Sequence, residues 1–208
     1  MIAWFATSLD IANCKILPGV EFKQMRTEPD VWSSANYTRE TAHQLTLINN
    51  NPIYGGTSAD ISIIRYLEEL KNRGFKIMFY PMVFVDLPNK PWRGHITGDA
   101  SHIDNFFEEY NKFILHYAKL VKGKVDAFII GSELIGITKL IVAIDKFCEL
   151  ADQVKQILGP AVKISYAADW SEYHHSEGGW YYLDKLWASD SIDFVGIDAY
   201  FPLTNDQR

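Results

Sequence analysis

Short apolar runs alternate with amphipathic segments along most of the chain. The apolar runs predict five strands, over residues 1–6, 75–86, 125–134, 161–170 and 191–203, and a weaker sixth strand over 43–48. Between them, apolar residues recur at helical spacing and predict helices over residues 57–74, 102–123, 138–160 and 180–189. Strands that alternate with helices are typical of an α/β protein.

The first two predicted helices have recognisable ends and apolar faces. Thr57 or Ser58 is in place to cap the first helix, and Gly74 follows its last apolar residue. The predicted buried face of the first helix consists of Ile61, Ile64, Leu67 and Leu70, and that of the second consists of Ile103, Phe106, Tyr110, Phe113, Tyr117 and Leu120.

The predicted strands are apolar on both faces, as parallel strands covered by helices are. An open doubly wound sheet and a (β/α)8 TIM barrel both meet this condition. Polar residues follow three successive strands: Glu133 after "FII", Asp169-Trp170 after "ISYAA", and Asp198 with Tyr200 after "FVGI". Functional groups at the carboxyl ends of several strands characterise the active face of a TIM barrel, so we expect the barrel.

The number of strands indicates that this barrel is incomplete in the chain. A TIM barrel has eight strands in about 250 residues, whereas the pattern predicts five firm strands and one weak strand. We therefore expect residues 1–208 to form one barrel domain that is a fragment of a longer chain. Residues 10–56 contain breakers such as Pro18-Gly19 and Pro52 and are predicted to form a long irregular insertion.

Composition narrows the class of partner. The formal net charge of −6 over 208 residues argues against nucleic acid and anionic membranes as partners. The sequence has no apolar stretch of membrane-spanning length and no signal peptide, so we expect neither membrane insertion nor export. No glycine-rich nucleotide fingerprint occurs, and no cofactor is expected. Cys148 lies on an apolar helical stripe and is expected to be a buried thiol, with a disulfide to Cys14 as the alternative.

Glu133 is the candidate catalytic residue. A retaining glycosidase needs two carboxyl groups about 5–5.5 Å apart, one of which donates a proton. Burial at the end of an apolar strand raises the pKa of a glutamate and suits that role. Tyr80, Trp92, Trp170 and Tyr200, near predicted strand ends, offer aromatic faces for a sugar. Alternatively, Glu133 pairs with a lysine or arginine or caps the next helix, and residue chemistry alone does not decide between these interpretations.

Six segments in a fixed order carry a family resemblance: "GFKIMFYPMVFVD", "PWRGHI", "FFEEYNKFILHYAKLV", "VDAFIIGSEL", "ISYAADWSEY" and "IDFVGIDAYFPL". Together they resemble the clan-A glycoside hydrolase barrels, especially the β-mannanase branch. With "AWF" and "YGGT" added, they resemble more closely the TIM-barrel-like domain of gene transfer agent and phage-type tail proteins. The resemblance covers nearly the whole chain.

The resemblance implies roles for individual residues. Glu133 corresponds to the acid/base at the end of the fourth barrel strand, so the chain carries about strands 2 to 6. The family nucleophile, a glutamate that ends the seventh strand, would lie beyond residue 208. Ser132 stands where the wider clan commonly has an asparagine. Asp198 is expected to form hydrogen bonds with tyrosine or tryptophan side chains or with the backbone at the rim of the barrel. Alternatively, Asp198 and Glu133 act together as the two carboxyl groups of an inverting glycosidase. Asp169 is expected to order a loop.

The function implied by the resemblance is contact with host-envelope glycans by a tail protein of a gene transfer agent or prophage. The carbohydrate ligand would contact Tyr80, Trp92, Asp169, Trp170, Asp198 and Tyr200. Other tail proteins would be partners, and the protein would stay in the cytoplasm until it is assembled into a tail-like particle. This fragment is expected to be inactive. The alternative is a retaining endo-glycosidase, similar to a β-mannanase, whose nucleophile lies beyond residue 208.

Two adjacent histidines near two glutamates could indicate a metal site, but the spacing of these residues argues against one. His174-His175 lie near Glu172 and Glu177, but adjacent histidines point apart and no third ligand follows at metal spacing. We expect a solvated loop here and no metal site.

Overall fold

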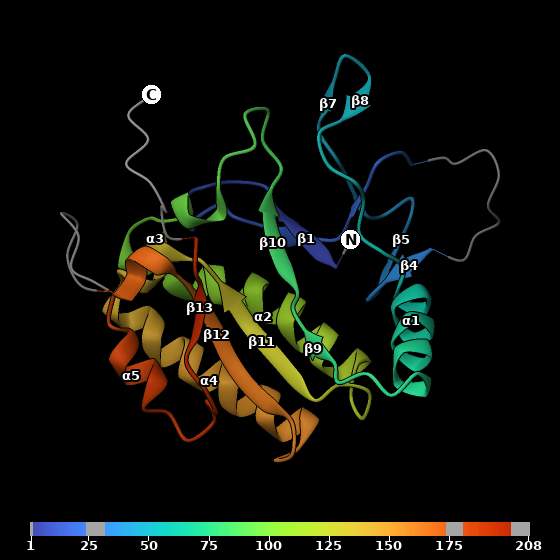
Figure 1. Ribbon diagram of the computed structural model, residues 1–208. Helices are drawn as coiled ribbons and strands as arrows, with labels where there is room; N and C mark the ends of the chain where they lie inside the picture. Colours follow the sequence, from blue (N-terminus) through green and yellow to red (C-terminus); the bar gives the residue numbers. More distant parts are fainter. Residues whose placement is uncertain (1, 24–31, 174–180, 201–208) are drawn as a thin grey trace.

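Two groups of parallel strands form the centre of the protein (Figure 1). The computed structural model describes residues 2–23, 32–173 and 181–200. In the first group β1 (Ala3–Ala6) pairs in parallel with β10 (Met82–Val85), and β2 (Ile16–Leu17) is antiparallel to β1. The second group has the order β13-β12-β11-β9, with every neighbour parallel. Its members are β9 (Met78–Phe79), β11 (Ala127–Ser132), β12 (Lys163–Asp169) and β13 (Gly196–Asp198).

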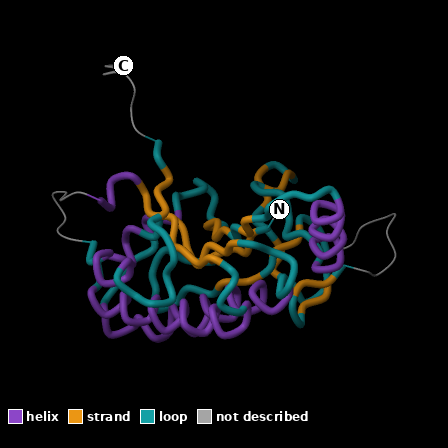
Figure 2. Tube along the Cα trace, turned by 60° about the horizontal axis from the view of Figure 1, so that its bottom comes forward, coloured by secondary structure: helices purple, strands orange, loops and turns teal. Residues whose placement is uncertain are grey.

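The helices lie on the outer side of these strands (Figures 1 and 2). They are α1 (Asp60–Asn72), α2 (Ile103–Leu120), α3 (Ile135–Thr138), α4 (Ile141–Leu158) and α5 (Leu183–Trp187). Three 3-10 turns, η1 (Arg93–His95), η2 (Ala100–His102) and η3 (Trp170–Tyr173), complete the helical elements. Parallel strands with helices outside them confirm the α/β prediction.

The core is rich in aromatic residues and is built around α2. Phe106, Tyr110, Phe113 and Tyr117 follow one another along this helix at helical spacing, and all are fully buried. Phe147 of α4 packs edge-on against Tyr110 with a centroid separation of 6.1 Å. The predicted buried face of this helix is therefore confirmed, except that Leu120 at its end is only partly buried.

The predicted strand over 75–86 is wrong as one continuous element. It divides at Tyr80-Pro81 into β9, which pairs with β11, and β10, which pairs with β1. Proline has no N–H to donate and constrains the residue before it, so a ladder is readily interrupted there. The break leaves the Tyr80 side chain in a position to bond across the strand ends, to Ser132 and Asp198.

The first helix also begins later than predicted. Its N-cap is Ala59, because Thr57 is used elsewhere: its hydroxyl donates to the Ala3 carbonyl at 2.7 Å and accepts from the Gly19 N–H at 2.9 Å. The buried residues of α1 are consequently Ile63 and Leu67, while Ile61, predicted to be buried, is 37% exposed.

The described residues of the region 10–56, which are 10–23 and 32–56, form short paired segments instead of a continuous sheet. Strands β3 (Gly19–Val20) and β6 (His43–Gln44) are parallel, β4 (Ser33–Ser34) pairs with β5 (Tyr37–Thr38), and β7 (Leu47–Ile48) pairs with β8 (Asn51–Pro52). The buried carboxylate of Asp86, at the end of β10, fixes this segment to the strands. It accepts hydrogen bonds from the Thr46 N–H and hydroxyl, and its Oδ2 lies 2.6 Å from His43 Nε2.

The two cysteines are separate thiols. Cys14 is buried, whereas Cys148, which was predicted to be a buried thiol, is partly buried against the core. Burial raises the pKa of the Cys14 thiol to about 11, so this group stays protonated at neutral pH. In the described part of the chain, no helix combines the length and apolar character needed to cross a membrane.

Gly136 allows α3 to contact the loop that carries Trp92 and Arg93. A Cβ at Gly136 would lie 2.3 Å from the Ile96 carbonyl oxygen and 2.9 Å from Thr97 Cβ. We expect Gly136→Ala to lower the free energy of unfolding by about 1–3 kcal/mol, because a backbone carbonyl cannot easily move aside. Denaturant unfolding measures this.

Gly55→Ala is the matched control, since its Cβ would meet only Glu21 Oε1 at 3.5 Å. We expect a change within about 0.5 kcal/mol. Equal stability of the two variants would show that α3 does not need the close contact.

Candidate functional site

Glu133 lies directly after β11 in a strained backbone conformation. Its φ is +50°, in the left-handed region that residues with a side chain adopt rarely. The pairing of β11 with β12 shifts register between Ile129 and Ser132, which redirects the residues at the end of the strand. Two hydrogen bonds hold the turn: Glu133 N–H donates to the Ala167 carbonyl at 2.9 Å, and Leu134 N–H donates to the Tyr166 hydroxyl at 2.7 Å.

The Glu133 carboxylate has two partners from the loop after β10. Trp92 Nε1 donates a hydrogen bond to Oε2 at 2.8 Å, and Arg93 Nη2 lies 2.8 Å from the same oxygen. Both charged side chains are about nine-tenths buried. Burial raises the pKa of Glu133 above its usual value; the Trp92 hydrogen bond and the Arg93 charge oppose this, and the charges of Asp198 and Asp169 add to it.

Tyr80, Ser132 and Asp198 meet beside Glu133. The Tyr80 hydroxyl lies 2.7 Å from both Ser132 Oγ and Asp198 Oδ2, and Ser132 Oγ lies 3.0 Å from Asp198 Oδ2. Arg93 joins them, because its Nη2 donates to Ser132 Oγ at 3.0 Å and its Nε donates to the Ser132 carbonyl at 3.1 Å. Burial, with the Asp198 charge, raises the pKa of Tyr80 well above its usual range. The ends of β9, β11 and β13 therefore contribute to one polar cluster.

Asp169 and Glu172 form a reciprocal cap after β12. Asp169 Oδ1 accepts from the Ser171 N–H at 2.9 Å and from its hydroxyl at 2.5 Å, while Glu172 Oε2 accepts from the Asp169 N–H at 2.6 Å. This is the pattern of a capping box. The geometry agrees with the expectation that Asp169 orders a loop.

The carboxyl group of Glu172 is buried, although the sequence predicts a solvated loop in this region. It is only 4% exposed, and its Oε1 accepts from Thr138 Oγ1 at 2.6 Å and from the Tyr166 hydroxyl at 3.3 Å. Burial raises its pKa to about 7, although its hydrogen-bond donors oppose the shift. Since Tyr166 also accepts from Leu134 N–H, Glu172 is linked through one side chain to the turn that holds Glu133.

The structure brings together most of the predicted site residues but not all of them. Glu133, Trp92, Tyr80 and Asp198 are connected by the contacts described above. Trp170 opens η3 beside Asp169 and is partly buried. Tyr200 does not join the cluster: it is 78% exposed, and its N–H bonds the Asp198 carbonyl at 3.0 Å. His174, His175 and Glu177 lie outside the described residues.

Sequence reasoning did not single out Arg93 or Tyr166, and it named Glu172 only as an acid near the histidine pair. Arg93 follows Trp92 directly in "PWRG". A signal for Glu172 was present, because an acid three residues after Asp169 has the spacing of a capping box. No local pattern marks Tyr166, whose role depends on the pairing of β12 with β11. Within residues 2–23, 32–173 and 181–200, no group of three or more histidine, cysteine or acidic residues could hold a metal ion.

Parallel strands with a cluster of polar side chains at their carboxyl ends define a TIM-barrel-like α/β domain. Residues 108–208 match the family model described as the GTA (gene transfer agent) TIM-barrel-like domain, which confirms the resemblance for that part of the sequence. A solved structure, the complex of a GH113 β-1,4-mannanase, superimposes with a TM-score of 0.57 at 22% identity. The alignment covers 74% of this chain and 46% of that one, so the chain spans less than half of the mannanase. No curated protein sequence matches the chain.

The buried Glu172 should make stability depend on pH. Its pKa is 4.5 when unperturbed and about 7 in the fold, so the folded protein binds the proton more tightly than the unfolded chain does. The resulting stabilisation is fully present below pH 4.5 and is lost as the pH rises through 7. We expect this group to contribute at most about 3 kcal/mol, which Glu172→Gln removes because glutamine cannot titrate.

Denaturant unfolding at pH 5 and pH 8 measures the effect. The difference in unfolding free energy between the two pH values should shrink in Glu172→Gln. It should stay unchanged in Glu149→Gln, which alters an acid whose side chain is 63% exposed on α4. An unchanged pH dependence in Glu172→Gln would show that this carboxyl group does not titrate between these values.

Proposed function

We propose that this chain is the glycoside-hydrolase-like domain of a tail protein of a gene transfer agent or related prophage, and that it contacts glycans of the host envelope. The observation that carries the proposal is the cluster of Glu133, Trp92, Tyr80 and Asp198 at the carboxyl ends of the strands. The match to the gene transfer agent domain and the fold shared with the mannanase support it. Other tail proteins would be its assembly partners.

The cluster has the chemistry that sugar recognition needs. Carboxylates accept hydrogen bonds from sugar hydroxyls, and an indole or phenol ring can pack against a sugar face. Trp92 is held in place by its bond to Glu133 and by close packing over Gly94, where an added Cβ would lie 2.4 Å from the ring. A fixed aromatic side chain loses little entropy when a ligand binds.

Binding without turnover is the activity that the contacts support best. Glu133 Oε2 is engaged by both Trp92 and Arg93, and Asp198 Oδ2 is engaged by Tyr80 and Ser132. Each carboxylate therefore already has partners within the protein. A retaining mechanism requires a second carboxyl group that is placed for attack on the sugar.

One observation favours a second candidate, a retaining endo-glycosidase similar to a β-mannanase. Burial raises the pKa of Glu133, as a general acid requires. The nucleophile of such an enzyme would have to come from outside the described residues.

Trp92→Ala and Glu133→Gln distinguish the two functions. With β-1,4-mannohexaose as the probe, we expect Trp92→Ala to weaken binding about fivefold to tenfold, because a packing surface for the sugar is lost. Glu133→Gln should leave affinity within about twofold, since glutamine keeps the shape and the hydrogen-bonding capacity of the side chain. Calorimetric titration measures affinity, and release of reducing sugar measures turnover.

Tyr66→Ala is the control for Trp92→Ala, because it removes an aromatic side chain that is 63% exposed on α1. Wild-type turnover that disappears in Glu133→Gln while affinity remains would establish the glycosidase instead. Absence of binding to mannan, cellulose, chitin and peptidoglycan fragments alike would refute the glycan-contact function.

A further inference from the structure

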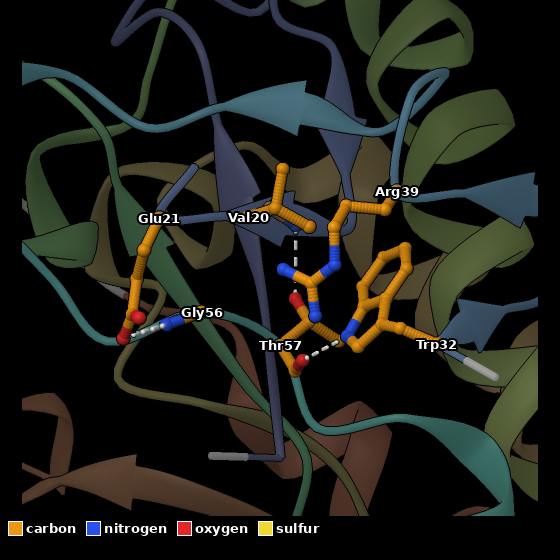
Figure 3. A pocket seen from close by; sticks show the side chains of 7 residues that line it. Val20, Glu21, Trp32, Arg39, Gly56 and Thr57 are labelled. Carbon is orange, nitrogen blue, oxygen red and sulfur yellow. Dashed lines mark hydrogen bonds between the residues drawn. The ribbon is translucent and has the colours of Figure 1, made fainter. Parts of the chain in front are cut away.

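A pocket unconnected with the Glu133 cluster lies between the segments before α1 and around β3 to β5 (Figure 3). Its volume is about 130 Å³. Since a cavity of about 150 Å³ can hold a benzene molecule, this space suits one small group or ring and not a whole oligosaccharide. Seven residues line it: Gly19, Val20, Glu21, Trp32, Arg39, Gly56 and Thr57.

The guanidinium of Arg39 lies over the indole ring of Trp32 and faces the pocket (Figure 3). It stands 5.6 Å from the ring centroid, and its Nη1 donates to the Phe22 carbonyl at a long 3.4 Å. Of the carboxylates in the described ranges, none forms an ion pair with it. A guanidinium over an indole ring is attracted by the ring and still keeps N–H donors for an anion.

Hydrogen bonds between the lining residues fix the walls of the pocket. Trp32 Nε1 donates to the Thr57 carbonyl at 2.8 Å, and Thr57 is itself fixed to Ala3 and Gly19. A side chain at Gly56 would bring a Cβ within 3.1 Å of the Gly19 carbonyl oxygen, so the two segments approach closely. The site is therefore assembled before any ligand arrives, which lowers the entropic cost of binding.

Glu21 places a negative charge in the same pocket. Its Oε1 accepts from the Gly56 N–H at 3.2 Å. In Figure 3 its carboxylate lies on the far side of Gly56 and Thr57 from the indole ring. This carboxylate would repel a phosphate more strongly than it repels a singly charged carboxylate, and a neutral hydroxyl group of the ligand would donate a hydrogen bond to it.

We propose that this pocket binds a sugar acid, with the carboxylate of the ligand on Arg39 and a hydroxyl group of the same ring on Glu21. A guanidinium binds a carboxylate through two parallel hydrogen bonds, which neutral sugars cannot form. The pocket takes the carboxylate edge of the ring, and the rest of the sugar lies outside. None of its seven lining residues belongs to the Glu133 cluster, so this proposal stands or falls independently of the proposed function.

Calorimetric or NMR titration with sodium glucuronate, glucose and sodium acetate tests the ligand class on the wild-type protein. We expect glucuronate to bind, glucose to bind at least about tenfold more weakly because it lacks the charged group, and acetate to bind more weakly than glucuronate because it lacks hydroxyl groups. Equal affinity for glucose and glucuronate, equal affinity for acetate and glucuronate, or no binding of glucuronate would each overturn the proposal.

Two variants locate the site. Arg39→Gln should weaken glucuronate binding about tenfold or more, and Glu21→Gln should weaken it less, because a neutral amide still accepts a hydrogen bond. Arg65→Gln is the matched control on the exposed side of α1 and should bind as the wild type does. If Arg39→Gln does not fold, Arg39→Lys keeps the charge but loses the two-bond geometry and should still reduce affinity. Unchanged affinity in a folded Arg39 variant refutes the site.

Discussion

The candidate site depends on the hydrogen bonds that hold the turn after β11 in its strained form. A φ of +50° at Glu133 persists only where the surrounding structure compensates for its cost. The compensation comes from β12, whose Ala167 carbonyl accepts from the Glu133 N–H and whose Tyr166 hydroxyl accepts from the Leu134 N–H. Tyr166 in turn contacts Glu172, which is fixed by Thr138 and by the backbone of Asp169. The direction in which Glu133 points is therefore determined by the neighbouring strand and its cap, not by the residues around Glu133 itself.

The polar cluster is formed by residues from distant parts of the chain, because several strands end beside the turn after β11. The break at Tyr80-Pro81 separates β9 from β10 and lets the Tyr80 hydroxyl reach both Ser132 and Asp198. Arg93 then connects Ser132 with Glu133, because its guanidinium contacts both residues. Parallel strands bring their carboxyl ends to one edge, so residues separated by more than a hundred positions in the chain meet there.

Much of the fold could be predicted from the sequence, and the reasons for the errors are physical. The apolar face of α2 was predictable because its period is helical over 18 residues and the core selects that face. The N-terminus of α1 was not, because Thr57 caps no helix and instead joins Ala3 to Gly19, which lie far away in the chain. At the site, Glu133 and Asp198 were predictable from their positions at strand ends. Tyr200 follows the same pattern but extends into solvent, since position along a strand does not determine which side chains turn inward.

The contacts of Glu133 shift the pKa of its carboxyl group in opposite directions. Burial and the nearby charges of Asp198 and Asp169 favour the neutral acid, whereas Trp92 and Arg93 stabilise the carboxylate. Because Arg93 also bonds Ser132 twice, it cannot leave Glu133 without disturbing the end of β11. A ligand that drew Arg93 away would raise the pKa of Glu133 further and favour its protonated form. A ligand that left Arg93 in place would meet a carboxylate whose Oε2 is already engaged. The position of Arg93 thus determines which form of the Glu133 carboxyl group a ligand would meet.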